Sequence, residues 1–165
     1  MKLKFAVLTT VVVAVATMIV WLAHAPQLET LISPSVALTP QWQEVRPARG
    51  MQTSAAWSEL LLEVPSQQFR QRDGELVLED GSPFRIEAYL TTDKGEQVTL
   101  DRVSPVSYNG RSFVRLSAAR LEGRQQDYLF SMLALRSNVA LRTGKVIWMS
   151  YDPRDTKDGV AFPKR

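Results

Sequence analysis

The chain has no cysteine, and its only histidine among 165 residues is His24, near the N-terminus. The absence of cysteine excludes disulfides, thiolate metal sites and a cysteine nucleophile. Without a histidine after residue 24, the remainder of the chain also lacks Ser-His and Cys-His nucleophilic systems and the common zinc sites. We therefore expect a protein that folds on its hydrophobic core alone and is not an enzyme.

An excess of one charge is almost missing as well. The chain has 20 basic and 17 acidic residues, and setting aside Lys2 and Lys4 leaves 18 against 17. Both signs are interspersed, whereas a nucleic-acid-binding domain gathers its basic residues on one face. We expect no nucleic-acid binding, and no motif in the chain indicates a cofactor.

One long hydrophobic run is present, and it spans residues 5–23. At roughly 1.5 Å per helical residue, a run of this length crosses the hydrocarbon core of a bilayer, which is about 30 Å thick. Lys2 and Lys4 before it favour a cytoplasmic N-terminus, and Trp21 suits the far membrane interface. Residues 1–25 are therefore predicted to be a single-pass membrane anchor, with the rest of the chain in the periplasm or outside the cell.

A cleaved secretory signal is the alternative, because Ala23, His24 and Ala25 follow a small-x-small cleavage pattern. Two features favour an uncleaved segment. The apolar run is longer than the roughly 7–15 residues of a typical signal core, and Pro26 would directly follow the cut. Both interpretations export the domain.

Residues 26–56 are expected to form a proline-rich linker without confident strands or helices. Four prolines, Pro26, Pro34, Pro40 and Pro47, are spread through it. Proline favours extended backbone and interrupts regular hydrogen-bond ladders. Trp42 is the one large aromatic residue of this segment, and it is expected either to contact the folded domain or to bind a partner.

The folded domain is predicted to span residues 57–165 and to be mainly β. Alternating residues in 59–64 predict a half-buried strand, and the pairs Asp80-Gly81, Lys94-Gly95 and Asn109-Gly110 predict turns between further strands. Residues 128–136 are interpreted as a strand rather than a buried helix, and 145–151 is rich in β-forming residues. Together these segments predict an antiparallel β-sandwich of about seven strands, in which these two segments are the most buried and an exposed tail follows residue 151.

Acidic residues give weak signals for chemistry. Asp152, Asp155 and Asp158 precede Gly159, but calcium loops space their ligands by two residues rather than three, so a turn is favoured over a metal site. Carboxylates for glycoside hydrolysis would need a close pair in a cleft. Glu59, Glu63, Glu79, Glu87, Asp93 and Asp101 are instead scattered through predicted strands and turns, and are interpreted as solvated.

Aromatic residues and arginines are the better candidates for a binding surface. The candidates for contact with a ligand or partner are Trp42, Arg85, Tyr89, Arg136, Trp148 and Tyr151. Trp148 lies mid-strand, where core packing is the ordinary role of a tryptophan. Tyr151 is on the opposite face and is the better candidate for exposure.

The first functional hypothesis is a non-enzymatic, membrane-anchored envelope protein whose β domain binds a protein, as an accessory subunit of a membrane assembly. The alternative is a module that binds polysaccharide or another envelope ligand. A hydrolase that uses carboxylates ranks third, because it needs an acid pair that the sequence does not locate. A concave face with Tyr and Trp beside Arg or Asp favours the second hypothesis, and a patch of exposed apolar residues without a cleft favours the first.

Overall fold

The computed structural model describes residues 28–53, 57–65, 69–72, 75–108, 110–121 and 128–151. These residues are mainly β, with strands β1 to β14 and one short 3-10 helix, η1 (Ala119–Leu121). Every strand pairing among them is antiparallel, which confirms the predicted class. The hydrophobic segment 5–23 lies outside the described residues, and none of the described residues belongs to a helix long and apolar enough to cross a membrane.

The first sheet has five strands in the order β1-β14-β5-β11-β10. Their bounds are Leu28–Ser33 for β1, Val146–Tyr151 for β14, Trp57–Val64 for β5, Arg111–Ser117 for β11 and Arg102–Tyr108 for β10. The central strands β5 and β14 are buried along almost their whole length. Unbroken apolar runs such as LLL in β5 suit a strand that is covered on both faces. The prediction that the strand over 59–64 is only half-buried is therefore wrong.

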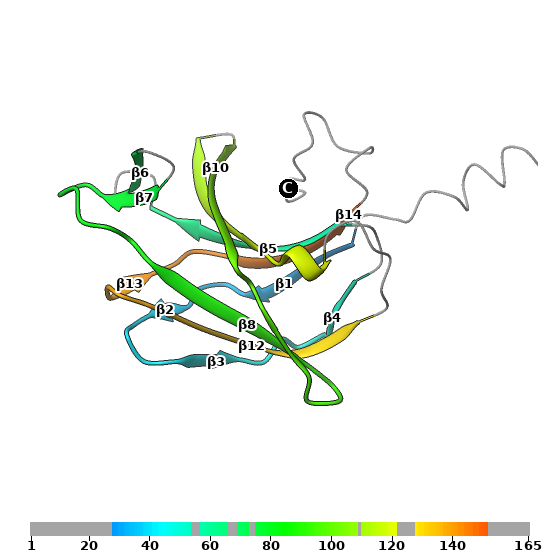
Figure 1. Ribbon diagram of the computed structural model, residues 1–165. Coiled ribbons are helices and arrows are strands. Elements are labelled where there is room, and N and C mark those ends of the chain that lie inside the picture. The colour runs from blue at the N-terminus through cyan, green and yellow to red at the C-terminus, as the bar shows by residue number, and fades with distance from the viewer. Residues whose placement is uncertain are drawn as a thin grey trace, which may run out of the picture.

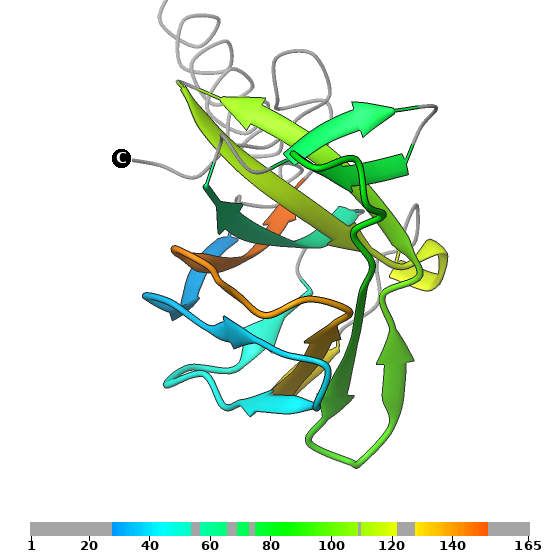
Figure 2. The same ribbon diagram turned by 90° about the vertical axis from the view of Figure 1, so that its left-hand side faces the viewer.

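The second sheet lies below the first in Figure 1 and follows the order β3-β12-β8-β9, with β4 also paired to β12. Its bounds are Gln43–Val45 for β3, Leu129–Ser137 for β12, Ile86–Thr92 for β8, Gln97–Thr99 for β9 and Met51–Gln52 for β4. β12 confirms the strand predicted over 128–136. Gly95, at a φ of 83°, closes the β8–β9 hairpin, which projects at the bottom of Figure 2.

Two short ribbons complete the described fold. β2 (Ala37–Leu38) pairs with β13 (Leu141–Arg142), and β6 (Phe69–Arg72) pairs with β7 (Glu75–Leu78). Gly81 has the positive φ of 82° that the Asp80-Gly81 turn requires. The chain then makes one isolated bridge, between Val77 and Pro83, before β8 leaves for the second sheet. This turn therefore reverses the chain without joining two neighbouring strands of one sheet.

The facing sides of the two sheets share one hydrophobic core. It includes Leu60, Leu62, Val114, Leu116 and Trp148 from the first sheet, and Leu90, Phe130, Leu133 and Leu135 from the second. Trp148 meets Phe130 edge-on at a centroid distance of 5.8 Å, and its indole N–H donates to the Gln52 carbonyl at 2.9 Å. Trp148 therefore occupies the interior, with no exposed surface.

The outer side of the first sheet carries a second buried cluster, made of Leu61, Phe113, Ile147, Met149 and Tyr151, with Trp57 partly buried against it. Tyr151 lies in this cluster rather than with Trp148 in the shared core, as their odd spacing predicts, but its side chain is only 2% exposed. The expectation that Tyr151 is accessible is therefore wrong. Its neighbours along β14 on this side are Ile147 and Met149, and its hydroxyl donates to Glu59 at 3.3 Å.

The segment predicted as a linker without strands contains β1, β2, β3 and β4, so that prediction is wrong for residues 28–52. Its prolines Pro34, Pro40 and Pro47 fall between these strands, where they remove no ladder hydrogen bond. Ile32, Val36, Leu38 and Met51 are buried in the shared core. Strands of two to six residues are too short to produce a periodic pattern, so the prolines were the clearest signal in this segment and predicted a linker.

Candidate functional site

The outward side of the second sheet is open and polar. In β8, Ile86, Ala88 and Leu90 are buried, whereas Glu87 and Tyr89 between them retain exposure. This alternation follows from the pleat of a strand that faces a core on one side only. Across the ladder, Glu87 lies opposite Arg136 of β12, and Tyr89 lies opposite Ala134.

Trp42 completes a cluster on this side. It precedes β3, whose Gln43 pairs with Leu135, so the chain brings Trp42 beside Arg136. The Arg136 guanidinium carbon lies 4.7 Å from the centroid of the Trp42 ring, and the rings of Trp42 and Tyr89 are 5.0 Å apart between centroids. Arg136 Nη2 also donates to Glu87 Oε2 at 2.7 Å. We call Trp42, Glu87, Tyr89 and Arg136 the Trp42 cluster.

The Trp42 cluster is accessible and held in place by its own contacts. Trp42 is 40% exposed, which makes it one of the few large apolar residues at the described surface. A cation over an exposed ring contributes about 0.5–1 kcal/mol, and an exposed ion pair about 0.2–1 kcal/mol. These contacts restrict the Arg136 side chain. The Trp42 cluster therefore presents aromatic rings and a guanidinium group to solvent in a fixed arrangement.

The structure brings together three of the six residues predicted for ligand or partner contact, namely Trp42, Tyr89 and Arg136. Arg85 is exposed next to the start of β8, where its backbone N–H donates to Asn138 Oδ1 at 2.8 Å. Trp148 and Tyr151 belong to the first sheet and are buried away from the cluster. The weak metal candidates Asp152, Asp155 and Asp158 lie outside the described residues.

Acidic residues form no metal site within the described ranges, where no group of three or more His, Cys, Asp or Glu gathers. Glu59, interpreted from the sequence as solvated, is 4% exposed in the outer cluster of the first sheet. Its carboxylate accepts from Tyr151 and lies 3.8 Å from Nε of Arg115. The Leu-rich run after Glu59 was the signal that both faces of this strand are covered.

A further polar contact fixes the end of the second sheet. Arg120 Nη2 donates to the Tyr128 hydroxyl at 3.2 Å and forms an ion pair with Glu96. These two partners, Tyr128 first, raise the pKa of Arg120 above its ordinary value. The Arg120 side chain thus connects η1 with the β8–β9 turn and with the residue that precedes β12.

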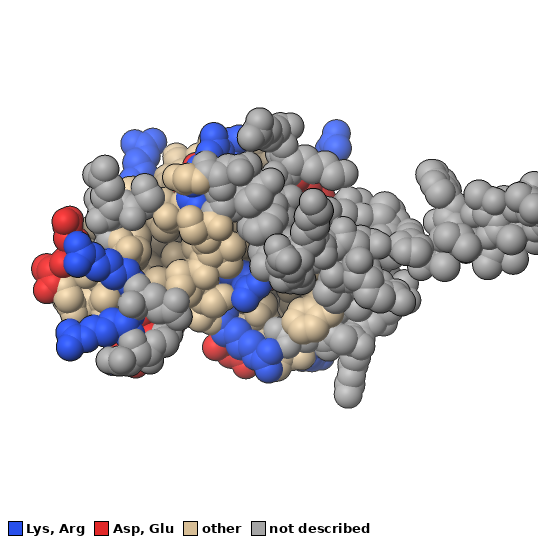
Figure 3. All heavy atoms as spheres, turned by 90° about the horizontal axis from the view of Figure 1, so that it is seen from above, with Lys and Arg blue, Asp and Glu red and all other residues tan. Residues whose placement is uncertain are grey.

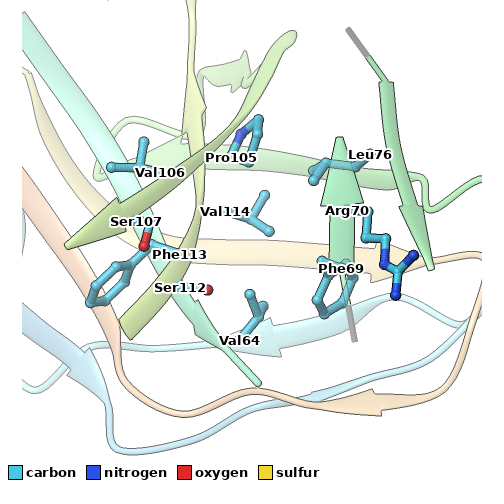
Figure 4. A pocket seen from close by; sticks show the side chains of 10 residues that line it. All are labelled: Val64, Phe69, Arg70, Leu76, Pro105, Val106, Ser107, Ser112, Phe113 and Val114. Atoms are coloured by element: carbon cyan, nitrogen blue, oxygen red, sulfur yellow. The ribbon is translucent and has the colours of Figure 1, made fainter. Parts of the chain in front are cut away.

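A cleft was not predicted from the sequence. It has a volume of about 280 Å³ and lies between the β6–β7 ribbon and the β10–β11 hairpin. Figure 4 shows Val64, Phe69, Leu76, Pro105 and Val114 around it, with Arg70 at the rim beyond Phe69. Its walls come from two parts of the chain, β5 to β7 and β10 to β11, and the pattern within either part does not indicate that they enclose a cleft.

A second cleft has a volume of about 370 Å³ and is lined by Arg85, Glu87 and Val103 among others. It adjoins the Trp42 cluster through Glu87. The two clefts share Leu76 but differ in charge, since the second has Glu75, Glu87 and Arg85 in its lining.

Charge on the face shown in Figure 3 is dispersed, with Lys and Arg at separate places and Asp and Glu among them.

Comparison with known proteins finds no matching family model, no similar curated protein and no similar solved structure. The arguments for function therefore rest on the geometry of this chain.

Proposed function

We propose that this protein is a non-enzymatic, membrane-anchored envelope protein whose β domain binds a protein partner through the Trp42 cluster. The single observation that carries the proposal is the convergence of an exposed Trp42 with Tyr89 and Arg136 on the open side of the second sheet. Trp, Tyr and Arg are the residues most enriched among those that dominate binding energy at protein interfaces.

The membrane part of the proposal rests on the sequence. The apolar run 5–23 follows Lys2 and Lys4, so the N-terminus is cytoplasmic and the β domain lies in the periplasm or outside the cell. The fold that we propose for this domain is an antiparallel β-sandwich, supported by two sheets that share one core. The role is that of an accessory subunit in a membrane assembly.

Polysaccharide binding is the second candidate. An exposed tryptophan ring offers a flat apolar surface, and the neighbouring Glu87 and Arg136 offer hydrogen bonds to hydroxyl groups. The guanidinium already lies over the Trp42 ring, and neither described cleft is lined by Trp42 or Tyr89. Sugar sites are usually concave, so a protein surface is the better-supported partner.

The test places a photo-crosslinking amino acid at position 44 of the full-length protein in native membranes. Glu44 is exposed and pairs with Ala134, next to the Trp42 cluster. We expect one protein to crosslink in stoichiometric amount. In the reciprocal experiment, a photo-crosslinking amino acid placed in that protein should crosslink to this chain. Trp42→Ala and Arg136→Ala should each reduce the crosslink, whereas Leu31→Ala, which removes a 53% exposed side chain from the first sheet, should not.

Two results would count against protein binding. If the crosslink persists unchanged in Trp42→Ala and Arg136→Ala, the cluster is not the binding surface. If no protein crosslinks, but the full-length protein in lipid nanodiscs is retained on defined polysaccharides in a Trp42-dependent way, the second candidate replaces the first.

A further inference from the structure

The cleft between the β6–β7 ribbon and the β10–β11 hairpin has mostly apolar walls. Val64, Leu76 and Val114 are buried core residues, and Phe69 packs against Phe84 with a centroid distance of 4.8 Å. Pro105 supplies a rigid wall from β10. At about 280 Å³ the cleft is slightly smaller than the roughly 300–1,000 Å³ of typical ligand sites, so it suits a small apolar group.

Edge strand β10 forms one wall of the cleft, and its proline prevents a further strand from pairing there. It ends the first sheet and carries Pro105 at its centre, opposite Val114. Proline has no N–H to offer an incoming strand, so its presence protects an edge against strand addition. An occupant of the cleft is therefore held by its contacts with side chains rather than by extension of the sheet.

Two polar groups in the cleft have no partner within the described part of the chain. Arg70 is the one charged residue of the described lining, is exposed, and makes no ion pair or hydrogen bond there. The hydroxyl of Ser112 likewise has no hydrogen-bond partner among the described residues. Ser107, directly opposite Ser112 in the ladder, makes only a long contact of 3.4 Å to the Arg111 carbonyl.

We propose that this cleft binds a small amphipathic acid, whose unbranched apolar chain lies against Val64, Leu76 and Val114 and whose anionic head meets Arg70. An apolar site with a few free polar groups is the usual form of a small-molecule site. The lone cation selects an anion over a neutral or cationic head, because no described acidic side chain lines the cleft. The proposal is independent of the Trp42 cluster.

A photo-reactive octanoate, added to the full-length protein in phosphatidylcholine nanodiscs, tests this site, with the labelled residues mapped by mass spectrometry. We expect saturable labelling of β6, β7, β10 and β11. Unlabelled octanoate should compete more strongly than octanol, by up to about fivefold, the upper end of what an exposed ion pair provides. Dihexanoyl phosphatidate is a further competitor, and its strength relative to octanoate distinguishes a lipid phosphate from a free carboxylic acid as the natural head group.

Variants make the test specific. Arg70→Gln should remove the advantage of octanoate over octanol, whereas Arg46→Gln, which changes an exposed arginine outside the cleft, should not. Ser112→Phe should fill the cleft and abolish labelling, with its circular dichroism and thermal unfolding as a check of folding. Equal competition by octanoate and octanol in the unmodified protein, or labelling confined to residues 5–23, would overturn the proposal.

Discussion

Strands β5 and β8 are both interior strands of antiparallel sheets, but they are covered differently. β5 is buried on both faces, with the sequence WSELLLEV, whereas β8 is buried on one face only, with IEAYLTT. The strand with strict alternation carries Glu87 and Tyr89 of the Trp42 cluster. The residues of the Trp42 cluster therefore lie on the sheet that has one side open to solvent. A continuous apolar run, as in β5, identifies the sheet that is covered on both sides.

The strongest test of this difference is Trp148→Ala against Trp42→Ala. Trp148 has no exposed surface, fills the core against Phe130 and donates to Gln52. Its loss leaves a cavity and an unpaired carbonyl, and is expected to lower the free energy of unfolding by about 3–5 kcal/mol, measured by urea denaturation. Trp148→Phe should cost less, and equal costs for the two tryptophans would contradict the comparison.

Leu61→Ala against Tyr89→Ala tests the outer sides of the two sheets. Leu61 is buried in the outer cluster of the first sheet, so its truncation is expected to cost about 2–4 kcal/mol. Tyr89 is only partly buried on the open side, and its truncation is expected to cost about 1 kcal/mol or less. Thermal unfolding of both variants measures the difference, and a Leu61→Ala protein as stable as Tyr89→Ala would show that the first sheet is open as well.

Trp42→Ala is expected to reduce binding much more than stability. The variant loses a ring contact with Tyr89 and an exposed cation–ring contact with Arg136, which together correspond to about 1–2.5 kcal/mol. The crosslink from position 44 should nevertheless be strongly reduced. Loss of folding in this variant, seen by circular dichroism, would instead assign Trp42 a structural role.

The smallest effect is expected in the turn after β7, outside both sheets. The Ser82 hydroxyl and backbone N–H donate to Asp80, and these bonds, the hydroxyl first, lower the pKa of Asp80. The carboxylate's contribution to stability is therefore present above its ordinary pKa and is lost as pH falls through the lowered value. Ser82→Ala should raise the Asp80 pKa towards its ordinary value, measured by NMR titration of the carboxyl carbon, and an unchanged titration would contradict this account.

Local patterns predicted part of this fold. Gly95 and Gly110 have the positive φ expected of turn glycines, and they lie in the connections from β8 to β9 and from β10 to β11. Such signals are local, because the conformation of two residues decides them. Strands β1 to β4 were missed because they are short and are held by pairing with β14, β13 and β12, which lie about a hundred residues further along the chain.

The candidate site shows the same limit. Trp42, Tyr89 and Arg136 were each indicated as exposed aromatic or basic residues, but their convergence depends on the order β3-β12-β8. No spacing in the sequence contains that order. Glu59 was misinterpreted because the burial of a carboxylate depends on what covers its strand, and the cleft beside Arg70 was missed because five separate strands build it.

The pairing of β1 with β14 has a consequence for biosynthesis. Leu28 lies opposite Ser150, so the first described strand acquires its ladder partner only when the last one is available. A ribosome releases residue 150 long after residue 28, and contacts of such high sequence separation make folding slow. Until the β14 segment has been synthesised, β1 lacks this ladder partner, and in that period a chaperone that covers the strand would protect it from pairing wrongly.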